Sequence, residues 1–225
     1  TNSIDIIGDF VGAELGSFIK DGKFTIKFGH CTGNFDCSGW NLISLEGCPN
    51  TVDETFECGA NNFIDLKGAP QNVREFICSL CDNLQSLEGA PQTVELFALR
   101  YCPNLKNLKG APQNVTTLEV RRSGLTSLEG SPKSVVNFDC SGNKELTSLQ
   151  GGPQKCYDYD CQRCSLTSLK GAPAELGFLF CDHNQISDWS YIPKVTVKMS
   201  ISDNLNITDQ LLERIKQNYA PDVYA

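Results

Sequence analysis

The stretch "SLEGAPQTV", residues 86–94, is one copy of a phrase that recurs along the chain. Close variants stand at 44–52, 65–73, 107–115, 127–135 and 168–176. The prolines of the phrase lie 20 or 21 residues apart, at Pro49, Pro70, Pro91, Pro112, Pro132, Pro153, Pro173 and Pro193. A fixed period of this length indicates stacked repeats, because one such unit is too small to bury its own apolar face. We therefore expect a single repeat domain.

Aligned on its proline, the unit reads V-x-x-F-x-C-x-x-N-x-L-x-x-L-x-G-A-P-x-x. The Phe and Cys positions are two residues apart, so both side chains leave the same face of a short strand. The segment "LEGAP" is too short for a helix and predicts a return arm in extended or polyproline form. Successive units then form a parallel ladder of strands about 4.8 Å apart.

The twelve cysteines all fall on positions that are apolar or Asn in other repeats. We interpret them as reduced thiols of the core. The pairs "CSLC" (78–81) and "CQRC" (161–164) have zinc-ligand spacing, but four repeats separate them, roughly 19 Å at strand spacing. One tetrahedral ion cannot bridge that gap. The sequence therefore predicts no metal site and no cofactor.

This unit resembles the leucine-rich repeat, whose core reads L-x-x-L-x-L-x-x-N/C-x-L, over about residues 31–205. The resemblance implies a β-rich solenoid of about nine rungs of 20–21 residues, with the parallel sheet on a concave face. Two groups of the family are similar: phage-encoded proteins with "L-x-S-L-E-G-A-P" repeats and, more distantly, short-repeat effectors of pathogenic bacteria. The phage type implies an accessory protein that acts on host or phage proteins in the host cytoplasm.

The two ends of the chain lack the phrase and predict caps. In "SFIKDGKFTIKF" (17–28), Asp21-Gly22 separates two alternating runs, which is typical of a β-hairpin. Thr208 is a candidate N-cap for a helix over 209–219 that would cover the last strand edge. We expect one domain over 1–225, composed of an N-terminal cap (1–30), repeats (31–205) and a C-terminal helical cap (206–225).

Several function classes are disfavoured by the sequence. The net charge of −8 argues against general binding of nucleic acids or anionic membranes. Residues 1–20 contain no basic leader followed by an apolar run, and no stretch approaches 18 apolar residues, so we expect a cytoplasmic protein without a membrane partner. Cys181 and His183 could form a catalytic pair only if Cys181 were exposed, and its column points inward. We predict that the chain is not an enzyme.

The remaining candidate site is the outward face of the sheet, where the residues do not repeat. Arginines and apolar side chains on this face favour a surface that binds another protein, with the chain itself a monomer. The candidate partner-binding residues are Ile77, Leu96, Arg100, Tyr101, Arg121, Arg122, Arg163, Phe178 and Phe180. The alternative is an anion-binding module, in which Arg100, Arg121, Arg122 and Arg163 hold a phosphate-bearing small molecule or a nucleic acid.

Overall fold

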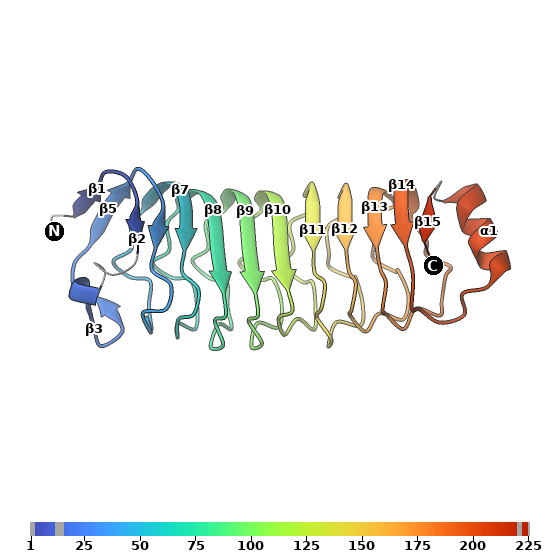
Figure 1. Ribbon diagram of the computed structural model, residues 1–225, viewed down its shortest axis with the longest axis horizontal. Helices are drawn as coiled ribbons and strands as arrows, with labels where there is room; N and C mark the ends of the chain where they lie inside the picture. The colour runs from blue at the N-terminus through green and yellow to red at the C-terminus, as the bar shows by residue number, and fades with distance from the viewer. Residues whose placement is uncertain (1–2, 12–15, 220–221, 225) are drawn as a thin grey trace.

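The computed structural model describes residues 3–11, 16–219 and 222–224. These residues form an elongated β-solenoid of about ten turns. The strands lie side by side along one face, the return arms run behind them, and the termini lie toward opposite ends (Figure 1). The expected parallel-sheet solenoid is therefore confirmed.

The main sheet contains thirteen strands among the described residues, and every pairing within it is parallel. Along the solenoid follow β1 (Ile4–Ile6), β5 (Phe28–Cys31), β7 (Thr51–Glu57), β8 (Asn72–Ser79), β9 (Thr93–Arg100), β10 (Asn114–Arg121), β11 (Asn137–Asp139), β12 (Asp158–Asp160), β13 (Glu175–Phe180), β14 (Lys194–Ser200) and β15 (Val223–Tyr224). Off this path, β6 (Phe35–Asp36) pairs with both β7 and β2 (Phe10–Val11).

The register turns each column of the repeat into a row of stacked side chains. Phe56, Phe76 and Phe97 are fully buried, and neighbouring rings lie 5.4 and 5.0 Å apart between centroids. All twelve cysteines are free, and all except the half-buried Cys156 are buried, as core thiols should be. The Phe column, the Cys column and the paired leucines thus form one continuous core.

The turn after each strand is closed by the Asn column. Asn143 is fully buried, and its Nδ2 donates hydrogen bonds to the carbonyls of Val120 and Cys140, both at 2.7 Å. Where Cys164 replaces Asn, only its Sγ reaches the carbonyl of Cys140, at 3.4 Å. The residue before this column adopts a left-handed conformation, with φ between 47° and 77°, in nine successive turns. These residues are Gly39, Ala60, Leu80, Tyr101, Arg122, Gly142, Arg163, His183 and Asp203.

The return arms contain no helix, and their glycines allow close stacking. At Gly89, where φ is 95°, a Cβ atom would lie 2.5 Å from the carbonyl oxygen of Leu66 in the preceding turn. Charged side chains on the arms alternate in sign, and Lys67 pairs with Glu88 of the next turn at 2.9 Å. Each such exposed pair contributes only about 0.2–1 kcal/mol, but the alternation also disfavours wrong stacking.

The N-terminal end contains the predicted hairpin, formed by β3 (Ile19–Lys20) and β4 (Lys23–Phe24), with Asp21 and Gly22 both at positive φ. The hairpin forms a separate sheet, and its Gly22 carbonyl accepts a hydrogen bond from Ile43 N of the first return arm at 2.9 Å. The end of the main sheet is formed instead by β1 and β2. The sequence pattern does not predict these two strands, because they lack the repeat phrase.

The predicted C-terminal helix is present as α1 (Asp209–Asn218). The Oγ1 atom of its N-cap, Thr208, accepts a hydrogen bond from Leu211 N at 3.2 Å, and Ile215 is fully buried. The helix was expected to cover the last strand edge, but the edge of β14 is paired instead with β15, which returns after the helix. None of the described residues belong to a helix of the length and apolarity needed to cross a membrane.

Candidate functional site

The side of the main sheet opposite the core, called here the open face, is free of helices and crossing loops in the described chain (Figure 1). Its side chains come from columns between the buried Phe and Cys positions. One column runs through Ile77, Ala98, Glu119, Asp139, Asp160 and Phe180, which are paired in register on successive strands. The parallel register therefore places residues 20 or 21 positions apart side by side.

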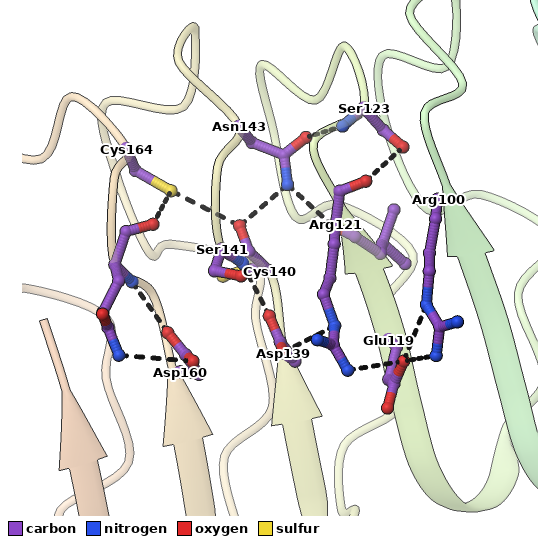
Figure 2. A network of polar contacts seen from close by, with 12 residues as sticks. Arg100, Glu119, Arg121, Ser123, Asp139, Cys140, Ser141, Asn143, Asp160 and Cys164 are labelled. Atoms are coloured by element: carbon purple, nitrogen blue, oxygen red, sulfur yellow. Dashed lines mark hydrogen bonds and ion pairs between the residues drawn. The ribbon is translucent and has the colours of Figure 1, made fainter. Parts of the chain in front are cut away.

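Two of the predicted arginines on the open face are neutralised by acids (Figure 2). Glu119 Oε2 lies 2.6 Å from Arg100 Nη2 and 2.8 Å from Arg121 Nη2, and Arg121 Nε lies 2.9 Å from Asp139 Oδ2. Burial alone would raise the pKa of Glu119, but the hydrogen bonds from both arginines outweigh burial and lower it. Arg100 and Arg121 are thus held in a charge-balanced network on the sheet.

Beyond this network the same face becomes acidic. Asp139, Asp158 and Asp160 lie on adjacent strands, and with Glu119 and Phe180 they line a hollow of about 300 Å³, called here the acidic hollow. Burial is the main cause that raises the pKa of Asp160 to about 7, the charges of Asp139 and Asp158 add to it, and Arg121 opposes it only in part. The pKa of Asp158 is raised by burial and by Asp139. Glu119 and Asp139 of this hollow are paired with arginines, whereas the structure records no ion pair within the described chain for Asp158 or Asp160.

An aromatic ridge borders the acidic hollow. The rings of Phe178 and Phe180 stack at 6.3 Å between centroids, and Tyr157 meets Phe178 edge-on at 5.7 Å. Gly177 makes this approach possible, because a Cβ atom there would lie 2.4 Å from the Tyr157 ring. Phe178 and Phe180 were predicted as site residues from the sequence, but Tyr157 was not. The signal that could have found it is the glycine inside a strand, which often marks a close approach.

The other predicted site residues lie elsewhere. Ile77 on β8 and Leu96 on β9 are half-buried on the open face, and four and three strands respectively separate them from β13, which carries Phe178 and Phe180. Tyr101, Arg122 and Arg163 do not lie on the strands but in the left-handed turns that follow them. The four arginines of the predicted anion-binding patch are therefore divided between the sheet network and the turn edge.

The turn-edge residues make contacts of their own. Arg122 Nη1 donates a hydrogen bond to the hydroxyl of Tyr101 at 2.7 Å, and its guanidinium lies over the Tyr101 ring. Arg163 Nη2 lies 3.4 Å from His183 Nε2, and His183 Nδ1 lies 2.9 Å from Asp203. Both imidazole nitrogens of His183 are thus engaged outside the core.

Cys181, the candidate thiol of the Cys/His pair, is fully buried, and its Sγ donates a hydrogen bond to the carbonyl of Ser200. Burial raises the pKa of this thiol well above its ordinary value. Among the described residues, no three His, Cys, Asp or Glu side chains are placed to hold a metal ion. Comparisons with protein-family models, curated proteins and solved structures found no match to this chain.

Proposed function

We propose that this protein is a leucine-rich-repeat solenoid of about nine repeats whose role is to bind another protein rather than to catalyse a reaction. The repeat phrase and the Asn-closed turns support the family assignment. The resemblance to phage-encoded proteins extends the proposal to an accessory protein that acts on host or phage proteins in the host cytoplasm.

One observation carries the binding role: an aromatic ridge beside an acidic hollow on the open face of β11 to β13. The repeat constrains only the inward columns, so aromatic side chains facing outward add nothing to the core. Exposed aromatic rings surrounded by polar groups are typical of binding hot spots. The neighbouring carboxylates favour a partner that brings basic side chains to the ridge.

The test compares two aromatic substitutions. Phe178→Ala with Phe180→Ala removes two half-buried rings of the ridge, whereas Tyr191→Ala removes an exposed aromatic ring that lies outside the main sheet. A partner captured from host lysate and then purified should bind the wild type and the Tyr191 variant equally. It should bind the double variant about 10–100-fold more weakly by calorimetry, the range expected for hot-spot residues.

Unchanged binding by the double variant would refute the assignment of the site. Both phenylalanines face away from the core, so the double variant should fold, and matching thermal unfolding would establish that its loss of binding is local.

A further inference from the structure

A second hollow lies at the edge of the solenoid, in the turns that follow β10, β11 and β12, and has a volume of about 510 Å³. Its charged lining residues are Arg122, Lys144, Glu145 and Arg163. None of these residues belongs to the acidic hollow or to the aromatic ridge. The hollow is therefore a separate feature of the molecule.

Its shape follows from the left-handed column of the repeat. Arg122, Gly142 and Arg163 occupy the same position in three successive turns, with φ of 47°, 74° and 55°. Two turns separate the arginines, roughly 10 Å at the strand spacing. Between them Gly142 has no side chain, and a Cβ atom there would lie 2.7 Å from Arg122 Cγ. The stem of Arg122 therefore packs over Gly142, while its guanidinium lies on Tyr101 and that of Arg163 lies beside His183. The hollow that both arginines line is called here the arginine notch.

The positive charge of the notch is not compensated within the described chain. Arg74, Arg100 and Arg121 all form ion pairs with acids, whereas the structure gives no acidic partner to Arg122, Arg163 or Lys144. The hollow's one lining carboxylate among the described residues, Glu145, is itself paired with Lys106 at 3.2 Å. Three unpaired cations around one hollow are unexpected in a chain with 27 acidic and 19 basic residues.

Arg122 is also held in place before any ligand arrives. Its hydrogen bond to the Tyr101 hydroxyl and its position over the Tyr101 ring restrict the guanidinium without neutralising it. On the other side, Arg163 contacts the imidazole of His183, which is neutral or positive. The Arg122 side chain is therefore already ordered, so a ligand that binds here does not bear the entropy cost of ordering it.

We propose that the arginine notch binds the phosphate group of a small molecule carrying one or two phosphates. Guanidinium groups match the geometry of phosphate oxygens, and Lys144 supplies a third positive charge. A long polyanion is disfavoured, because it would extend over the acids of the open face and approach a chain of net charge −8. This site goes beyond the proposed protein-binding function and does not depend on it.

In the experiment, the full chain is titrated with inorganic phosphate and, separately, with pyrophosphate at low ionic strength. Isothermal calorimetry measures the binding. Saturable binding of one ion per chain is expected for at least one of the two probes. Arg122→Gln and Arg163→Gln should each weaken it about tenfold or more, because each removes a charged hydrogen-bond donor. Arg74→Gln is the matched control, since Arg74 is engaged by Glu54 and Glu75, and should bind like the wild type.

The proposal is overturned if neither probe binds saturably, or if the arginine variants bind as the wild type does. Tighter binding of a single-stranded oligonucleotide than of pyrophosphate would also overturn it, in favour of a nucleic-acid site. The Phe178→Ala/Phe180→Ala protein should keep full phosphate binding, which separates this test from that of the protein-binding face. All substituted side chains at the notch are exposed, and unchanged unfolding midpoints would show that the variants fold.

Discussion

Tyr159 and Gly152 illustrate how a departure from the repeat at one position is matched at another. Tyr159 occupies the buried column that holds Phe in most repeats, and Gly152 occupies the position that holds Ala, Ser, Cys or, before Pro193, Ile elsewhere. A Cβ atom on Gly152 would lie 3.1 Å from the Tyr159 hydroxyl, and 3.0 Å from both Leu128 Cδ1 and the carbonyl oxygen of Leu149. That hydroxyl is buried and has no hydrogen-bond partner among the described residues. The glycine therefore makes room for a hydroxyl that gains nothing from burial.

The two residues should be coupled energetically. Tyr159→Phe removes an unpaired buried hydroxyl and should raise the free energy of unfolding by about 1 kcal/mol. Gly152→Ala should destabilise the wild type and cost less in the Tyr159→Phe background, where the crowding oxygen is absent. Urea unfolding of the four proteins of this double-mutant cycle measures the coupling. Strictly additive effects would contradict the proposed contact.

The inward residues could be predicted from the sequence because the repeat fixes which face each column occupies. Some of the predicted outward residues, such as Arg100 and Phe180, lie on the strands, whereas Tyr101, Arg122 and Arg163 lie in the turns. The interactions of these side chains were not foreseen. Arg100 was interpreted as a free cation, whereas its partner Glu119 belongs to the next strand and to the neighbouring column. Long side chains reach diagonally across a sheet, and a consensus that constrains only the core does not record such contacts.

The solenoid depends on glycine, in its turns and in its return arms, for two separable reasons: the backbone conformation of glycine and its lack of a Cβ atom. Gly89 has φ of 95° and no space for a Cβ atom beside the preceding turn, whereas Gly39 has φ of 77° and open space around it. Gly39→Ala should therefore cost only the backbone strain, about 1–2 kcal/mol. Gly89→Ala adds a backbone clash that stacked neighbours cannot relieve, and should cost clearly more.

Chemical denaturation of the two alanine variants checks this order. Equal losses of stability would mean that close stacking of the return arms is not what the glycine provides. A larger loss of stability in Gly89→Ala than in Gly39→Ala would indicate that the Gly-Ala-Pro segment keeps successive turns at strand spacing.

The caps show where local signals suffice for prediction. The β3–β4 hairpin and α1 were predicted because Asp-Gly and Thr208 act within a few residues. Strands β1, β2 and β15 were missed, since each has two or three residues and carries no periodic pattern. Their pairing is decided by the open sheet edge they meet, which exists only once the solenoid has formed.

Stacking identical turns has an electrostatic consequence for the whole molecule. Acids that recur in one column are brought to strand spacing, about 4.8 Å, where like charges repel. Where arginines reach the column, as at Glu119, the pKa of the carboxyl falls. Where burial and neighbouring acids outweigh any arginine, the pKa of the carboxyl rises, as at Asp160, Asp158 and Glu57. The solenoid therefore holds protons at a pH where its unfolded chain has released them.

Stability should accordingly decrease as pH rises toward neutrality. The pKa of Asp160 is about 7 in the folded protein and about 4 in an unfolded chain, so between these values the folded state binds more protons. The stabilisation from this group is complete below about pH 4 and is lost as pH rises through about 7. Asp160→Asn mimics the protonated form and can still accept the hydrogen bond from Gln162 N. At pH 8 this variant should be more stable than the wild type by on the order of 1–2 kcal/mol, and at pH 4 about equally stable.

Urea unfolding at several pH values measures this difference, with Asp82→Asn, which alters an exposed carboxylate after β8, as the control. Asp158 and Glu57 shift in the same direction, so part of the pH dependence should remain in the Asp160 variant. A constant difference between wild type and Asp160→Asn across the range would mean that the Asp160 carboxyl ionises normally. The acidic hollow would then carry its full negative charge at every pH at which a basic partner meets it.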